Sequence, residues 1–277
     1  MKKQLLLIAT ALFAVGCTQK SDYECQFTLN GETHLTLNFT NVKTPQTFYF
    51  LYNQSFPLDQ FKKTFRVESD TTIEYTLSLN HPAEAPCWCD SIEFIMFLIQ
   101  NETLTVNIDL ANSNVTFEGF TKQICEHLTN NPTILAEDFE NDESYFAKID
   151  STYADKQKSL DSAYSVGLLP QWFRDYQTEN LSFHKVFLKQ GCAYDDLNKM
   201  DILRKCEPIR ESKYYWIDDY TNFLCMFSAP RFDTLLGYGV SNEVFYEYVQ
   251  DNINTVKSKL SEDISSYFTA VRLSNYL

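Results

Sequence analysis

The spacing of apolar side chains changes near Gly119, and this change constrains the fold more than any other feature. Before it, apolar and polar residues alternate, as they do around Leu35, Leu37 and Phe39. A period of two places one set of side chains in a core and the other in water, as in a β-strand. Strands are therefore predicted over 34–40, 48–52, 61–67, 72–79, 92–99 and 103–110. Short strands separated by turn residues predict an antiparallel β-sandwich or barrel, here over residues 24–120.

After residue 121 the apolar side chains recur at steps of three, four and seven residues, which is the spacing of one helix face. Helices are predicted over 146–164, 172–187, 195–205 and 245–260. A last helix is expected to begin at Ser261, with Glu262 and Asp263 in its first turn, where acidic side chains favour the helix dipole. Residues 121–277 are thus expected to form a helical region, which makes the fold class α+β.

The first residues predict export. Met1-Lys2-Lys3 is a short basic start, and an uncharged run over 5–15 leads to Gly16-Cys17. This pattern is typical of a secretory signal peptide, and the run is shorter than the roughly 20 residues that cross a bilayer. Residues 1–16 are expected to be removed. The ending resembles a bacterial lipobox, with Ala14 where the usual Leu stands, so Cys17 is expected to carry the lipid, including palmitate; an ordinary signal peptide cleaved nearby is the alternative.

A polar stretch follows Cys17, and residues 17–23 are expected to form a lipidated tether. Its Lys, Ser and acidic residues partly resemble the signal that sends Bacteroidetes lipoproteins to the outer face of the outer membrane. The expected location is therefore the bacterial cell envelope, anchored to a membrane by lipid, with the outer membrane favoured. The choice between a periplasmic and a surface face stays open.

Composition excludes several kinds of partner. The formal net charge is −14, and no basic stripe interrupts it, so phosphate backbones would repel the chain and nucleic acid is not an expected partner. The chain has only 7 glycines and no Gly-rich phosphate loop. It also lacks the Gly-x-Ser-x-Gly motif of serine hydrolases. No cofactor and no metal ion are expected.

One region resembles a known family. Residues 102–110 (ETLTVNIDL) precede 114–119 (NVTFEG), and a candidate helix over 121–130 follows. This order resembles the end of the N-terminal β-domain in Bacteroidetes lipoproteins of the thiol-disulfide oxidoreductase family, which belong to the thioredoxin family. The resemblance implies a β-domain, then a helical segment whose end is similar to 264–277, together with the lipid anchor and the envelope compartment. A protein partner in the envelope is a separate expectation, which belongs to a non-catalytic role.

The chain departs from that family at the catalytic motif. The family carries a thioredoxin-like domain with Cys-x-x-Cys, and that domain is expected near where the printed chain ends at Leu277. No pair of cysteines here has this spacing. The spacing matters because it places an acidified thiolate at a helix N-terminus beside a resolving thiol. The family's redox activity is therefore not assigned to any residue of this chain.

Cysteines are the remaining candidate site residues, and with Cys17 lipidated an odd number is left. Cys87 and Cys89 flank Trp88, and they could be a redox dithiol, part of a metal chelate, or structural residues that share one face of a strand. Joining them with Cys125 and His127 would give a zinc site, which the one-residue spacings disfavour. Cys192 and Cys206 flank a predicted helix, and a disulfide between them is expected.

The acidic residues are spread along the chain, and the densest places are 138–143 and Asp218-Asp219. Both are expected to be solvated surface. No catalytic motif is recognised, so the leading hypothesis is a non-catalytic binding or accessory lipoprotein. Two alternatives remain: a redox helper that uses Cys87 and Cys89, and a glycan- or nutrient-binding surface lipoprotein that uses the many aromatic residues.

Overall fold

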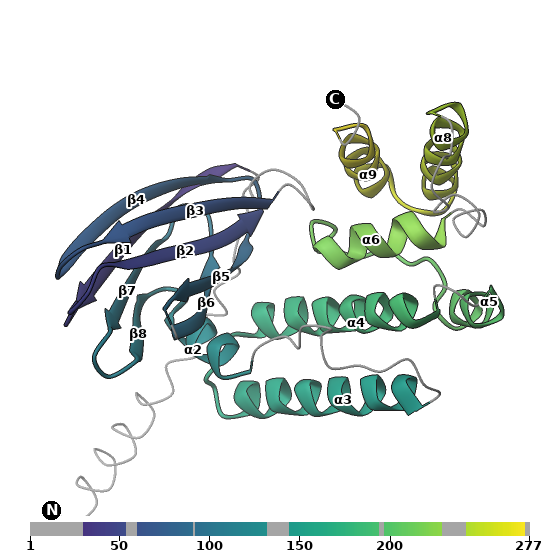
Figure 1. Ribbon diagram of the computed structural model, residues 1–277. Coiled ribbons are helices and arrows are strands. Elements are labelled where there is room, and N and C mark those ends of the chain that lie inside the picture. Colours follow the sequence, from purple (N-terminus) through teal and green to yellow (C-terminus); the bar gives the residue numbers. More distant parts are fainter. Residues whose placement is uncertain are drawn as a thin grey trace, which may run out of the picture.

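A computed structural model describes residues 30–53, 60–90, 92–131, 144–193, 197–228 and 242–274 (Figure 1). A β-sandwich comes first and a helical region follows, so the predicted α+β fold class is confirmed. The expected signal peptide, Cys17 and the tether lie outside the described residues. None of the helices in the described ranges is long and apolar enough to cross a membrane.

The first sheet contains four strands in the order β4-β1-β7-β8. Their bounds are Thr71–Leu79, Gly31–Thr40, Thr103–Asp109 and Asn114–Gly119, in that order. β1 pairs with β4 in antiparallel register, and β7 with β8 likewise. The central pair differs from the sequence prediction, because β1 and β7 run parallel, with His34 opposite Thr103 and Thr40 opposite Asp109.

The second sheet contains four strands in the order β3-β2-β5-β6, and every neighbouring pair is antiparallel. Their bounds are Gln60–Val67, Gln46–Asn53, Ala83–Cys89 and Ile92–Leu98, in that order. The two sheets face each other across an apolar core. Phe39 of β1 meets Phe48 of β2 with ring centroids 5.4 Å apart, so the sandwich is formed rather than the barrel.

Strand β5 was not among the predicted strands, because Pro82 and Pro86 interrupt its pattern. A proline has no N–H to donate, so within a sheet it needs a position where no ladder bond is lost. The register of β5 with β2 covers Cys87 to Cys89, with Cys87 opposite Phe50, so the preceding residue Pro86 lies outside it. On its other side Pro86 lies opposite Ile95 of β6. The strand therefore tolerates Pro86 because pairing with β2 stops beside it.

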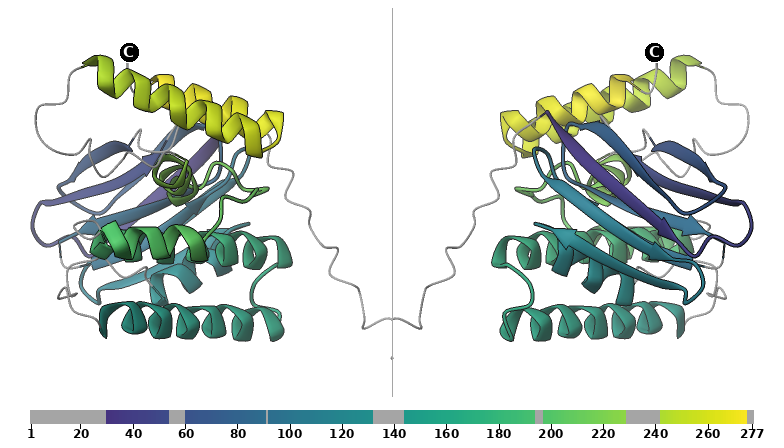
Figure 2. Two further views of the ribbon diagram at one scale, coloured as in Figure 1. Left: turned by 90° about the vertical axis from the view of Figure 1, so that its right-hand side faces the viewer. Right: turned by 90° about the vertical axis from the view of Figure 1, so that its left-hand side faces the viewer.

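The described helices form a layer beside the sandwich, stacked from α3 at one end to α8 and α9 at the other (Figure 2). Their bounds are α2 Lys122–Asn130, α3 Ser144–Ser165, α4 Gln171–Ala193, α5 Leu197–Cys206, α6 Asp218–Phe227, α8 Asn242–Lys259 and α9 Glu262–Ser274. The helices predicted from spacing match α3, α4, α5, α8 and α9 within a few residues at most of their ends, although α4 continues beyond the predicted end at residue 187.

Strand β6 joins the sandwich to the helices. Phe97 is fully buried and points away from the sandwich core onto α4. Its ring centroid lies 5.3 Å from that of Phe173 and 5.5 Å from that of Tyr176. Beside it, the backbone N–H of Ile95 donates to Oγ1 of Thr129 in α2 over 3.1 Å. The helical region is therefore docked through an aromatic joint on the outer face of β6.

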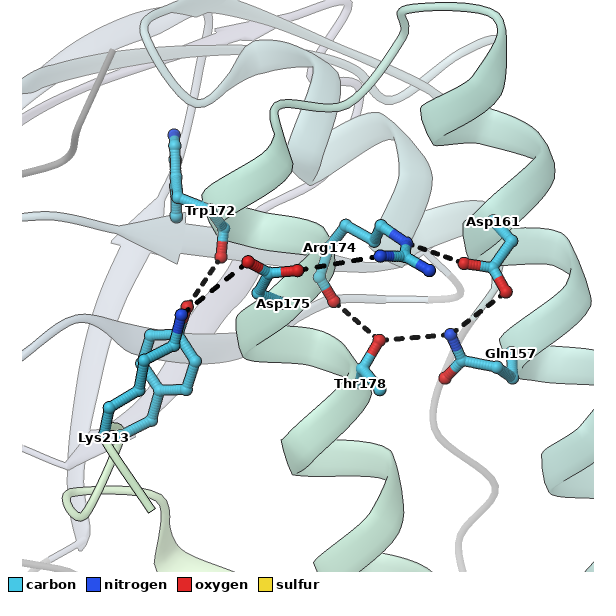
Figure 3. A network of polar contacts seen from close by, with 8 residues as sticks. Gln157, Asp161, Trp172, Arg174, Asp175, Thr178 and Lys213 are labelled. Carbon is cyan, nitrogen blue, oxygen red and sulfur yellow. Dashed lines mark hydrogen bonds and ion pairs between the residues drawn. The ribbon is translucent and has the colours of Figure 1, made fainter. Parts of the chain in front are cut away.

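A polar network links α3 to α4 at the surface (Figure 3). Arg174 Nε donates to Asp161 Oδ1 over 2.7 Å. Gln157 Nε2 bridges Asp161 and Thr178, at 3.3 and 3.1 Å. The hydrogen bond from Arg174 lowers the pKa of the Asp161 carboxyl. Because both charged side chains are more than a third exposed, this network orients the two helices more than it stabilises them.

Candidate functional site

Three carboxylates meet where the sandwich borders the helical region, and we call them the acidic seam: Glu84, Asp218 and Asp219. Glu84 lies on β5 and points to the outer face of its sheet, since its neighbours Ala83 and Ala85 face the core. Asp218 and Asp219 begin α6, where acidic side chains favour the helix dipole. All three are half-buried. The expectation that Asp218-Asp219 is solvated surface is therefore wrong.

Amide side chains from both parts of the molecule hold the seam. Asn180 Nδ2 on α4 donates to Glu84 Oε1 over 3.0 Å. Asn53 Nδ2, at the end of β2, donates to Asp218 Oδ2 in a short hydrogen bond. His184 Nδ1 on α4 lies 3.8 Å from Asp219 Oδ2. Each carboxylate thus contacts a side chain from an element other than its own. The bond from Asn53 connects the sandwich directly to α6.

Burial shifts the protonation of the seam toward neutral carboxyls. Burial, together with the negative charges of Asp218 and Asp219, raises the pKa of Glu84 to about 7, against the opposing effects of the Asn180 hydrogen bond and the charge of Lys156. Burial together with the Asp219 charge raises the pKa of Asp218 to about 7, against the bond from Asn53. The pKa of Asp219 is raised as well, again mainly by burial. The seam therefore favours protonated carboxyls near neutral pH.

The basic groups beside the seam do not fully neutralise it. Burial lowers the pKa of His184, although Asp219 opposes this shift. Burial likewise lowers the pKa of Lys156 on α3, against the charge of Glu84. His184 and Asp219 thus both move toward their neutral forms, so their 3.8 Å contact is weaker than a full ion pair.

The tyrosines around the seam respond to the same charges. The pKa values of Tyr153, Tyr176 and Tyr267 are all raised, mainly by burial and then by one or more of the acidic seam residues. Their hydroxyls therefore stay neutral and add no negative charge to the seam. Across the described ranges, no group of three or more His, Cys, Asp or Glu residues is arranged to hold a metal ion. The feature that distinguishes the seam is the raised pKa of its three carboxyls.

The predicted cysteine sites are core positions. Cys87 and Cys89 both face the sandwich interior, as two residues on one strand face should, and both are free thiols with 1% and 0% exposure. Cys125 on α2 is free and buried too, and its sulfur accepts a hydrogen bond from the Phe97 N–H over 3.2 Å. The zinc site that would join them with His127 is not formed among the described residues.

Burial makes these core thiols poor nucleophiles. It raises the pKa of Cys87 well above its usual value, and the pKa values of Cys89 and Cys125 to about 11. The reactive form of cysteine is the thiolate, and a buried thiol with a raised pKa is inert. The structure therefore gives no support to a redox dithiol at Cys87 and Cys89.

The expected disulfide between Cys192 and Cys206 is not formed, because Cys206 is a free, exposed thiol in α5. The Cys192 side chain lies outside the described residues. The prediction relied on the two cysteines flanking one helix. Cys206 is instead the last residue of α5, and Cys192 belongs to the end of α4.

An aromatic pair stands on the outer face of the second sheet. Tyr49 of β2 and Trp88 of β5 are opposite each other in the register, and their rings stack with centroids 5.1 Å apart and planes at 19°. Lys62 Nζ of β3 lies 4.0 Å from the Tyr49 ring centroid, as a cation–π contact. Both rings are half-buried, so they offer partly accessible aromatic surface.

Comparisons with known proteins give no family. No family model matches the chain, and no curated protein matches it either. Among solved structures, the type VI secretion lipoprotein TssJ1 from Pseudomonas aeruginosa is similar to 32% of this chain and 96% of its own, at 8% identity and a TM-score of 0.26. A candidate cell adhesion protein from Bacteroides ovatus is similar to 33% of this chain and 43% of its own, at 12% identity and a TM-score of 0.20.

The membrane-binding domain of pneumolysin is similar to 33% of this chain and 96% of its own, at 12% identity and a TM-score of 0.19. These scores are too low to relate the whole fold of this chain to any of the three proteins. The resemblance to thiol-disulfide oxidoreductase lipoproteins stays a prediction.

Proposed function

We propose that the chain is a lipid-anchored protein of the bacterial cell envelope, whose folded part is a non-catalytic binding or accessory module. The signal peptide and lipobox pattern ending at Cys17 supports the anchor. The order of sandwich, α2 and helical region agrees with the architecture that the oxidoreductase-lipoprotein resemblance implies. A protein partner in the envelope is the expectation that belongs to this non-catalytic role.

The burial of the thiols is the observation against disulfide exchange by this chain. Disulfide exchange needs an exposed, acidified thiolate with a resolving thiol beside it. Cys87, Cys89 and Cys125 have raised pKa values and are enclosed in the sandwich core or under α2. Cys206 is exposed, but it is a free thiol at the end of α5 and no other free thiol among the described residues is exposed.

An insulin-reduction assay tests this part. The purified chain without its signal peptide is expected to show no turnover above a reaction that lacks protein. A Cys87→Ser, Cys89→Ser double variant is the matched control, and it should give the same background rate. Turnover by the unchanged chain that disappears in the double variant would contradict the proposal and restore the redox hypothesis.

Labelling with a palmitate analogue in the bacterial host tests the anchor. The unchanged protein should take up label and sediment with membranes, whereas a Cys17→Ser variant should lose both properties. Cys206→Ser serves as a control for thiol loss elsewhere, since that residue lies on the surface of α5. Retention of label in the Cys17→Ser variant would show that the anchor assignment is wrong.

Glycan binding is the second candidate, and the stacked pair Tyr49 and Trp88 favours it. Sugar rings present C–H groups that pack against aromatic faces, and Lys62 beside Tyr49 adds a hydrogen-bond donor. A glycan array probed with the purified chain should show binding that a Trp88→Ala variant loses. Phe245→Ala, which removes an aromatic ring 43% exposed on α8, is the control and should leave binding unchanged. An array without signal excludes this candidate.

A further inference from the structure

The acidic seam is a place where charged and amide side chains of the sandwich and the helical region contact each other. The sandwich contributes Glu84 of β5 and Asn53 of β2, and the helices contribute Asp218 and Asp219 of α6. Other ionisable groups face the seam from three helices: Lys156 and Tyr153 from α3, Tyr176 and His184 from α4, and Tyr267 from α9. Burial lowers the pKa values of both Lys156 and His184, so it disfavours the positive charge on each of the two basic groups beside the seam.

We propose that the acidic seam is a proton-operated contact: protons on Glu84 and Asp218 hold the helical region against the sandwich, and losing them weakens this docking. The geometry gives the reason. Glu84 of the sandwich accepts a hydrogen bond from Asn180 of α4, and Asp218 of α6 accepts one from Asn53 of the sandwich, so each acid is bonded to the other part of the molecule. When both are ionised, the three carboxylates carry like charges in a half-buried place.

The direction of the pH effect follows from the pKa values. The pKa of Glu84 and that of Asp218 are each about 7 when the parts are docked, against usual values of 4.5 and 3.8. The docked state therefore binds more protons than the unfolded chain between these limits. The stabilisation that the protonated Glu84 and Asp218 give to the docked state is complete below pH of about 4. It declines as the pH rises and is lost above pH of about 7.

Urea unfolding between pH 5 and pH 9 tests the proposal on the chain without its signal peptide. The equilibrium constant for unfolding should rise by up to about tenfold per pH unit for each carboxyl as the pH goes from 5 to 7. A Glu84→Gln, Asp218→Asn variant mimics the two protonated acids and should lose their contributions to this rise, keeping only the part that comes from Asp219. Histidines whose pKa values are lowered change the stability in the opposite direction, and they do so in the unchanged chain and in the variant alike. The difference between the two stability curves therefore reports the contribution of the seam carboxyls.

A matched control removes two exposed acids, Glu93 of β6 and Asp251 of α8, by Glu93→Gln and Asp251→Asn. This variant should keep the pH dependence of the unchanged chain. If the Glu84→Gln, Asp218→Asn variant keeps it instead, or if the control loses it, the proposal is overturned.

Carbon-13 NMR of the carboxyl groups in the unchanged chain keeps the proposal testable if the seam variant does not fold. Two carboxyls should titrate near pH 7, and the side-chain amide signals of Asn53 and Asn180 should shift with them. Asn38, whose amide donates to Asn107 Oδ1 over 2.8 Å, is the internal control and should not shift in that range. Titration of all carboxyls below pH 5 would overturn the proposal.

Discussion

Solvent access, rather than spacing along the chain, decides what each cysteine of this protein can do. Cys206 is exposed, whereas Cys87, Cys89, Cys125 and Cys225 are free but buried. We expect iodoacetamide to label Cys206 within minutes in the folded chain and to leave the four buried thiols unlabelled until urea is added. Mass spectrometry of tryptic peptides measures this for each cysteine. Rapid labelling of Cys87 or Cys89 without denaturant would contradict the placement of β5.

Two glycines provide a matched pair at the residue scale. Gly119 ends β8 with φ +122°, and a Cβ there would lie 2.4 Å from the backbone oxygen of Thr103. Gly119→Ala should therefore destabilise the fold by about 1–3 kcal/mol. Gly191 lies in α4 with no atom near its missing Cβ, so Gly191→Ala should stabilise by about 0.5–1 kcal/mol. The midpoints of urea unfolding measure both changes in stability. Equal effects of the two substitutions would contradict the strained backbone inferred at Gly119.

At the scale of elements, the aromatic joint between β6 and α4 should matter more than any surface network. Phe97 is fully buried between Phe173 and Tyr176, so Phe97→Ala leaves a cavity there and should cost roughly 3–5 kcal/mol. Phe61→Ala on β3 is the control, because that ring is 41% exposed, and it should cost less than about 1 kcal/mol. Comparable losses in the two variants would show that β6 does not carry the docking.

The elements that could be predicted from the sequence are those whose apolar spacing is recognisable without knowing which strand or helix they contact. Alternation located β1, β4 and β7, and helical spacing located α3, α4, α8 and α9. β5 escaped prediction because Pro86 looks incompatible with a strand until its pairing with β2 is known to stop at Cys87. The parallel pairing of β1 with β7 was missed for a related reason, since alternation reports which face is buried and says nothing about strand direction.

The acidic seam was missed because it depends on tertiary structure. Asp218-Asp219 stands out in the sequence, but a pair of acids at a helix start is equally compatible with a solvated surface. Glu84 carries no signal of its own, and it meets the pair only because β5 borders α6. Burial of the two aspartates could have been suspected from one clue, the aromatic and apolar residues that follow them from Tyr220 to Phe227.

At the scale of the whole molecule, the sandwich is not expected to be self-sufficient. α2 and α4 cover the outer face of β6, where Ile95 and Phe97 would otherwise meet water. A fragment of residues 24–120 should therefore bind the dye ANS and unfold at lower urea concentration than the chain of residues 24–277. Fluorescence and circular dichroism measure the two properties. A fragment that matches the longer chain in both would show that the helical region is only appended.

The parallel pairing of β1 with β7 also sets an order of assembly. β1 lies between β4 and β7, and its partner residues in β7 are 69 positions further along the chain, as Asn38 and Asn107 are. A chain that leaves a translocation channel with its N-terminus first can pair β1 with β4 early, but the other side of β1 stays open until β7 has emerged. Such late, non-local closure slows folding and leaves strand edges unpaired for longer. If the chain is exported as proposed, the first sheet is the part of the molecule that most needs protection on the way.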